Sequence, residues 1–253
     1  MKLPAPGAPA PDARDALAAA AEACRGVRTI SAEVGASGSI GGSGLRGRLL
    51  VGLAAPGSAR IEAVAPFGQP IFIFVARGNE ATLLLPRDER VLERGDPRAV
   101  LRAVTGLPLD AAALRSALTG CPATTGADGQ TAGDNWRIVT SGGESVYLHR
   151  DARSAPWRVA AVVHDTGGSD EWRAEYRDYE AGLPHTVRMT NRDRKRFDLR
   201  LALSQVEINT PLGAEVFRVD VPRGATPIDI RELEEAGPLR GQTLSAAPKG
   251  SPR

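Results

Sequence analysis

The sequence has 253 residues, with 42% hydrophobic content and 32 Lys and Arg against 30 Asp and Glu. A chain of this length can bury a substantial core. Its nearly balanced charge excludes the global positive field that would hold nucleic acid. No apolar run approaches the roughly 20 residues that a membrane-spanning helix needs, and the longest is 71–76.

Residues 1–11 are rich in Pro and Ala, a composition that predicts an extended linker. They lack the apolar core and cleavage site of a secretory signal. We interpret them as the spacer that follows a removed lipoprotein leader, and the alternative is a cytoplasmic protein. A helix is then predicted from Asp12, a candidate N-cap, through Cys24, with Gly26 just past its end.

Most of the remaining chain predicts short strands separated by turns. Apolar and polar residues alternate most clearly over 197–203, where every second residue is apolar, as on a strand with one wet face. The expected strands are 29–40, 45–53, 60–63, 71–76, 81–85, 90–93, 136–139, 146–149, 157–164, 171–179, 186–191 and 196–208. About 11–12 antiparallel strands suit one large curled sheet, whose concave side must be filled by helices or by a ligand.

Two short helices interrupt the strands. The first is predicted by Asp96 as its cap and Pro97 at its first position, and the second runs from Asp110 as its cap to Gly120. Their apolar faces are enough to cover part of a sheet. We therefore expect one main domain over 12–230, followed by a tail, 231–253, whose Pro, Gly and charged composition predicts disorder.

Two segments resemble the LolB family of the LolA/LolB lipoprotein-localisation superfamily. Residues 60–68 match, in spacing, an Arg-led strand that enters a Pro-Leu-Gly hairpin. Residues 100–122 match a helix, a Thr-Gly-Leu-Pro-Leu link, a second helix and a Gly-x-Pro exit. The match is strongest over 60–122 and extends, as a pattern of strands, roughly over 12–208.

This resemblance implies a mainly β fold, a half-closed antiparallel β-barrel with an N-terminal helix and a helical lid. It implies a protein without catalytic activity that receives acylated lipoproteins or other lipids in an apolar cavity. The cargo would come from a LolA-like periplasmic carrier and would be inserted into the outer membrane. The native protein would then be anchored to that membrane on its periplasmic side, and we expect a monomer.

The resemblance also assigns a membrane-contacting hairpin. In the LolB family the apolar residue of the hairpin touches the membrane, and the matching position is Phe67, between Pro66 and Gly68. An exposed ring gains from entering hydrocarbon while the backbone of the turn stays at the interface. The alternative is a ring folded back over the edge of the sheet. This chain has Ala65 where the family has Asn, and Phe67 where it has Leu.

Inward apolar positions of the strands and helices are candidates to line the cavity, although a filled core would use the same residues. These candidates are Ile61, Ala63, Ile71, Ile73, Leu101, Val104, Leu114, Leu118, Leu199, Leu201 and Leu203. Each acyl CH₂ removed from water contributes on the order of 0.8 kcal/mol, so even a short cavity would bind a lipid. A second hypothesis is an anchored structural or sensing lipoprotein that uses this fold to bind a partner.

Cys24 and Cys121 are too far apart in sequence for a redox pair or a zinc knuckle. They predict either a disulfide between the N-terminal helix and a later one or two buried thiols. The three histidines, His149, His164 and His185, show no metal-ligand spacing. We therefore expect no metal and no cofactor.

One motif suggests an enzyme. Asp165, Thr166 and Gly167 form the Asp-Thr-Gly triplet of aspartic proteases, which need two carboxylates that share a proton. Only one triplet is present, and residues 164–170 are better interpreted as a hairpin turn. The basic run 192–196 is interpreted as a solvated hairpin tip.

Overall fold

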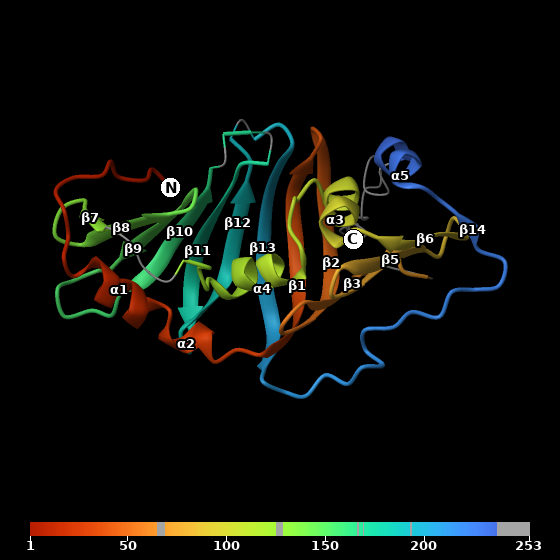
Figure 1. The fold of residues 1–253 in the computed structure, drawn as a ribbon, viewed down its shortest axis with the longest axis horizontal. Coiled ribbons are helices and arrows are strands. Elements are labelled where there is room, and N and C mark those ends of the chain that lie inside the picture. The colour runs from red at the N-terminus through yellow and green to blue at the C-terminus, as the bar shows by residue number, and fades with distance from the viewer. Residues whose placement is uncertain (65–68, 125–128, 166, 169, 193, 237–253) are drawn as a thin grey trace, which may run out of the picture. The chain divides into compact units, whose positions relative to one another are not determined.

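The computed structural model describes residues 1–64, 69–124, 129–165, 167–168, 170–192 and 194–236 (Figure 1). The chain forms two compact units, which are described separately. Unit 1 comprises residues 1–27 and 113–194, and unit 2 comprises residues 28–112 and 195–253. The described residues contain fourteen strands, mostly antiparallel, and a few short helices. The predicted fold class, mainly β with an open antiparallel sheet, is confirmed.

The sheet of unit 2 has the linear strand order β14-β6-β5-β4-β3-β2-β1-β13. Its strands are β1 (Thr29–Ile40), β2 (Ser43–Ala54), β3 (Ser58–Val64), β4 (Phe72–Arg77), β5 (Glu80–Leu85), β6 (Arg90–Gly95), β13 (Phe197–Ile208) and β14 (Thr226–Pro227). All neighbours pair antiparallel except β14, which runs parallel to β6. The turn between β1 and β2 uses Gly41 and Gly42, both at positive φ, a conformation that glycine adopts without strain.

Residues 209–225 form a strap along the face of this sheet that carries Arg60 and Gly52. This feature was not predicted from the sequence. The Arg60 guanidinium donates to the carbonyl oxygens of Val216 and Arg218 at 3.1 and 2.7 Å. Beside Gly52, the side chains of Leu212 and Val216 approach the sheet. The strap continues into β14, where the amide of Thr226 donates to the carbonyl of Glu89 at 2.8 Å.

Two helices belong wholly to unit 2. In α3 (Pro97–Thr105) the predicted cap is confirmed, because the Asp96 carboxylate accepts a hydrogen bond from the Ala99 amide at 2.8 Å. The helix ends at Gly106, whose φ of 75° is the left-handed conformation typical of a helix C-terminus. The second helix, α5 (Ile230–Ala236), packs on α3. It begins at Ile230, the last residue of the predicted domain, and continues through residues 231–236, whose composition had predicted disorder.

Unit 1 has the linear strand order β12-β11-β10-β9-β8-β7. Its strands are β7 (Gly129–Thr131), β8 (Trp136–Ser141), β9 (Glu144–His149), β10 (Arg158–His164), β11 (Trp172–Glu180) and β12 (Leu183–Thr190), and its helices are α1 (Ala13–Ala20), α2 (Glu22–Arg25) and all but the first two residues of α4 (Ala111–Thr119). The predicted N-terminal helix is therefore divided at Ala21.

The N-terminal segment pairs with the edge of this sheet. The amide of Gly7 donates to the carbonyl of Thr131 at 2.7 Å, and the amide of Thr131 donates back to Ala8 at 2.8 Å. Ala10 makes a similar bond to Gly129. Residues 7–10 thus extend the sheet past β7, in the segment whose composition predicted an extended linker. The reason is that an edge strand offers unpaired backbone groups that an extended, Pro-rich chain can satisfy.

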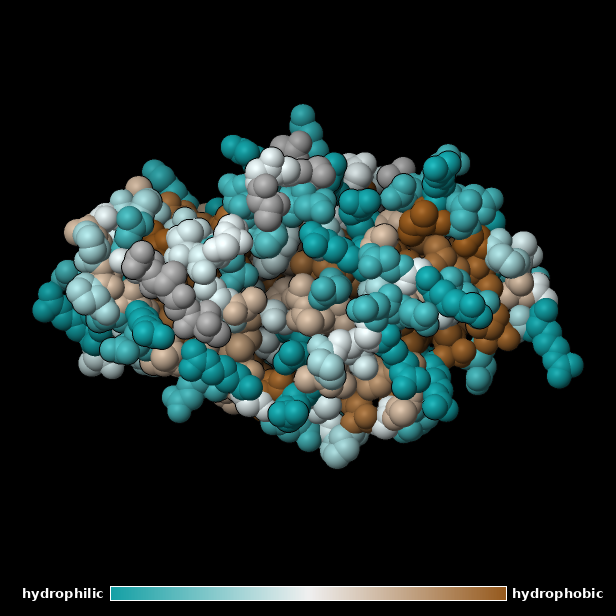
Figure 2. Space-filling view, in the orientation of Figure 1, coloured by the Kyte–Doolittle hydropathy of each residue, from teal (hydrophilic) through white to brown (hydrophobic). Residues whose placement is uncertain are grey.

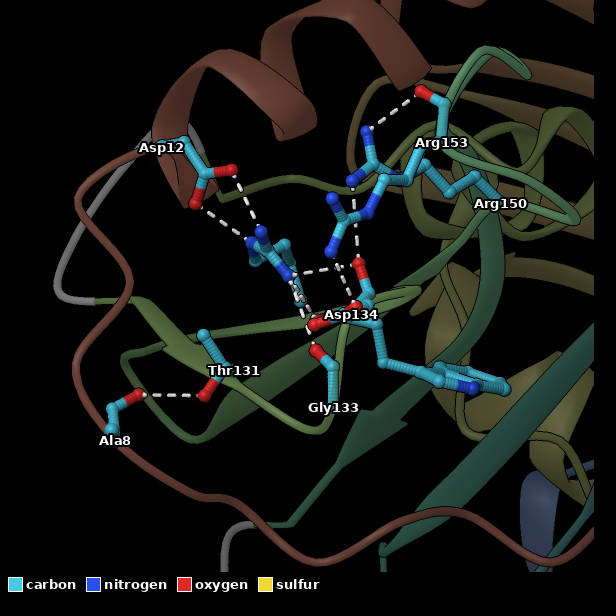
Figure 3. Close-up of polar contacts among 9 residues, drawn as sticks. Ala8, Asp12, Thr131, Gly133, Asp134, Arg150 and Arg153 are labelled. Carbon is cyan, nitrogen blue, oxygen red and sulfur yellow. Dashed lines mark hydrogen bonds and ion pairs between the residues drawn. The ribbon is translucent and has the colours of Figure 1, made fainter.

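Asp12 also differs from its predicted role. Its side chain makes no cap hydrogen bond. Its two carboxylate oxygens instead accept hydrogen bonds from Arg137 at 2.7 and 2.8 Å (Figure 3). These bonds lower the pKa of the Asp12 carboxyl below its usual value. A bidentate ion pair therefore joins the start of α1 to β8.

Cys24 and Cys121 form a disulfide in unit 1, with their Cα atoms 5.5 Å apart. The bond joins α2 to the segment that follows α4. Nearby, the Arg115 guanidinium donates to the Val27 carbonyl at 2.9 Å. Of the two alternatives that the sequence left open, the structure contains the disulfide.

Candidate functional site

The strand registers of unit 2 place a continuous row of apolar side chains on one face of its sheet. Residues directly opposite in an antiparallel pair point to the same side. Leu201 lies opposite Ala36, Val51 opposite Ile61, and Ile61 opposite Phe74, so the same face passes from strand to strand. We call it the apolar face. Its larger members are Leu199, Leu201, Leu203, Val34, Ile40, Leu45, Leu49, Val51, Leu53, Ile61, Phe72, Phe74, Leu83 and Leu92.

Five of the predicted cavity residues are brought together on this face: Ile61, Ala63, Leu199, Leu201 and Leu203. Ile73 is not, since it lies opposite Glu62 on the other side of the sheet. Ile71 is buried just before β4, where its amide donates to the Ala63 carbonyl.

The two phenylalanines of β4, Phe72 and Phe74, share the face with Ile61, and sequence reasoning missed both. The run 71–76 consists of apolar residues throughout, so no alternation marked which of them point inward. The neighbouring strand β3 carried the missing signal. There Arg60 and Glu62 alternate with Ile61 and Ala63 and identify the inner side.

Two glycines position α3 against the apolar face. An added Cβ at Gly106 would lie 3.7 Å from side-chain atoms of both Ile40 and Phe197, which places the end of α3 against those two residues. An added Cβ at Gly95 would lie 2.5 Å from Leu92 and 2.6 Å from Val100. The start of α3 therefore packs closely on β6 because residue 95 has no side chain.

The helical candidates are divided between the units. Leu101 and Val104 lie on α3 and are buried in unit 2. Leu114 and Leu118 are buried in the part of α4 that belongs to unit 1, so they are not part of the apolar face as defined here. Among the described residues of unit 2, the complete helices are α3 and α5.

Figure 2 shows apolar side chains gathered over β4–β6, next to α3 and α5, with hydrophilic residues around them. The apolar side chains of these strands are buried, apart from the half-buried Ile73, so they form a packed layer. Leu49, on the apolar face, is half-buried, whereas its chain neighbour Leu50 is 45% exposed and points to the opposite side. The two leucines therefore lie on opposite sides of β2, Leu49 on the apolar face and Leu50 on the other side.

The proposed membrane-contacting hairpin, Pro66, Phe67 and Gly68, lies outside the described residues. The assignment of Phe67 stays a prediction from the sequence resemblance. No helix of the described chain combines the length and the apolar character needed to cross a membrane.

Asp165 occupies an exposed turn. The amide of Gly167 donates to its carboxylate at 3.0 Å, and this hydrogen bond lowers the pKa of the Asp165 carboxyl. An acid that donates a proton near neutral pH needs a raised pKa instead. The hydrogen bond between Gly167 and Asp165 is typical of a turn, and Thr166 lies outside the described residues. Within the described ranges, no three His, Cys, Asp or Glu side chains are grouped in a way that would hold a metal ion.

Fold and site together define a class: an open antiparallel β-sheet with a few short helices and one continuous apolar face, whose members named above are all buried except the half-buried Leu49. No protein-family model matches the sequence, and no curated protein matches it significantly. Among solved structures, the chain is similar to a LolA superfamily protein from Nitrosomonas europaea, with a TM-score of 0.57 and 12% identity over 82% of this chain and 97% of that one. This likeness shows that the fold is LolA-like.

Two further solved structures match with lower scores. A DUF1329 family protein from Desulfovibrio piger has a TM-score of 0.47 at 12% identity, over 84% of this chain and 98% of that one. The lipoprotein LppX from Mycobacterium tuberculosis has a TM-score of 0.35 at 12% identity, over 80% and 98%.

Proposed function

We propose that this protein is a lipid carrier that holds acyl chains against the apolar face of unit 2. The observation that supports the proposal is the continuous apolar face from β13 to β6, on which Leu49 is half-buried and the other large members are buried. Contact with hydrocarbon contributes about 0.8 kcal/mol for each CH₂ removed from water. A chain of about a dozen carbons therefore gains roughly 10 kcal/mol, which is comparable with the free energy that association costs.

Replacing Leu49 with glutamate tests this proposal. A carboxylate on the apolar face would have to lose water when an acyl chain binds, and we expect the affinity for a fluorescent fatty acid to fall by about tenfold. Because Leu49 is only half-buried, the folded protein should tolerate the charge. Affinity is measured by probe titration, and native mass spectrometry of the purified protein reports acyl ligands that it already carries.

The matched control is Leu50→Glu, which adds the same charge one residue away on the opposite side of β2. We expect this variant to bind the probe as the wild type does. Equal losses in both variants would contradict binding at the apolar face, and a wild type that takes up no acyl probe would exclude the carrier function.

We further propose that the cargo is an acylated lipoprotein received from a LolA-like carrier and inserted into the outer membrane, with the hairpin of Phe67 as the membrane contact. The sequence resemblance over 60–122 supports this step. Phe67→Glu should slow the transfer of a lipoprotein to lipid vesicles by about tenfold, because a charged side chain cannot enter hydrocarbon, while the cargo still binds. Transfer is followed by vesicle flotation, and Leu50→Glu again serves as the control. Unchanged transfer by Phe67→Glu would limit Phe67 to a structural role.

A further inference from the structure

The short helix α5 is held against β6 and α3 by a buried apolar side chain and by ion pairs. Leu233 is completely buried. On either side of it, Glu232 pairs with Arg90 of β6 at 3.0 Å, and Glu234 pairs with Arg102 of α3 at 3.9 Å. Figure 1 shows α5 beside α3, near the strands over which apolar side chains gather in Figure 2. The helix thus presents an apolar side chain and carboxylates together at one edge of the apolar face.

The charged part of this attachment is weak. The side chains of Glu232 and Glu234 are 51% and 48% exposed, and those of Arg90 and Arg102 are 31% and 47% exposed. An exposed ion pair of this kind shifts an equilibrium by no more than about fivefold. The helix has only seven residues, too few to be stable without its tertiary contacts. A ligand that offers the same groups can therefore compete with it.

The segment Glu232-Leu233-Glu234 has the chemistry of an amphiphile, with carboxylates next to an apolar group. We propose that Arg90 and Arg102 form the head-group site of an acyl ligand with a carboxylate head, such as a fatty acid, and that α5 occupies this site until the ligand displaces it. The acyl chain takes the place of Leu233 beside the apolar face, and the ligand's carboxylate pairs with the guanidinium groups that the helix releases. This inference rests on the proposed acyl-chain binding and adds the preference for an anionic head.

The test compares laurate with 1-dodecanol, which has the same chain length without the charge, by titration of the full-length protein. In E232Q/E234Q both ion pairs are lost and the arginines remain, so both ligands should bind roughly three- to tenfold tighter. In R90Q/R102Q the helix is loosened equally but the head-group site is gone. Dodecanol should then bind tighter by a similar factor, and the preference for laurate should disappear.

Glu235→Gln is the matched control, because it removes the same charge from the same helix at a residue for which no ion pair to Arg90 or Arg102 is present. It should bind both ligands as the wild type does. The inference is overturned if R90Q/R102Q keeps the laurate preference of the wild type, or if E232Q/E234Q binds neither ligand more tightly. If the proposed function itself is wrong, a different result is expected: neither laurate nor dodecanol will bind to the wild type or to any of the variants.

Discussion

Removing the disulfide, by the double replacement Cys24→Ala and Cys121→Ala, is expected to lower the free energy of unfolding of unit 1 by about 4 kcal/mol. The two cysteines are 97 residues apart in sequence, and a cross-link over so long a loop greatly restricts the unfolded chain. Cys24 is buried, so part of the loss will come from the packing of α2. Such a bond persists in an oxidising compartment, which agrees with the periplasmic location proposed above.

Tryptophan fluorescence during urea unfolding measures this effect, because all three tryptophans, Trp136, Trp157 and Trp172, belong to unit 1. Wild-type protein treated with a reductant is the control and should unfold at nearly the same urea concentration as the double variant. If the variant unfolds at the midpoint of the oxidised wild type, the disulfide does not contribute to stability.

The second large effect is expected at Gly38. This residue lies inside β1 with a φ of 135°, and a Cβ added there would lie 1.9 Å from the carbonyl oxygen of Asp198 on β13. Gly38→Ala must move the paired strands β1 and β13 apart or force alanine into a conformation that L-residues avoid. We expect the free energy of unfolding of unit 2 to fall by about 3 kcal/mol, from strain and lost strand pairing together.

Gly44→Ala is the matched control, because no atom lies within 4 Å of an added Cβ at Gly44 and its φ is not positive. It should change stability by less than about 1 kcal/mol. Unit 2 contains no tryptophan or tyrosine, so its unfolding is best followed by hydrogen exchange of β1 and β13. Equal protection in Gly38→Ala and Gly44→Ala would show that the backbone at Gly38 can relax.

Local patterns were sufficient for much of the fold. The alternation over 197–203 predicted β13 and its inward residues, and Asp96 with Pro97 predicted the start of α3. These signals depend on neighbours within a few residues: the pleat of a strand turns every second side chain to one side, and a cap bonds to an amide three residues away. Elements of this kind can be predicted without knowledge of the rest of the chain.

The candidate site depended more on tertiary contacts. The inward side of 71–76 was decided only by pairing with β3, since a uniformly apolar run does not distinguish its two sides. The sequence could not show that the acidic residues of α5 form ion pairs, because their partners Arg90 and Arg102 lie more than 130 residues earlier. Neither pairing can be predicted from residues that are close together in the sequence.

The sequence by itself determined that this protein forms short antiparallel strands with one apolar side and a few capped helices, because period-two alternation and capping are properties of adjacent residues. Only the tertiary structure decided where Asp12, the N-terminal segment, the strap 209–225 and α5 bind. Asp12 bonds to Arg137 across 125 residues, and Arg60 bonds to Val216 across 156. The physical reason is that a polar group near a sheet pairs with whichever partner the completed fold brings within reach, and that choice is made by the packing of the whole sheet.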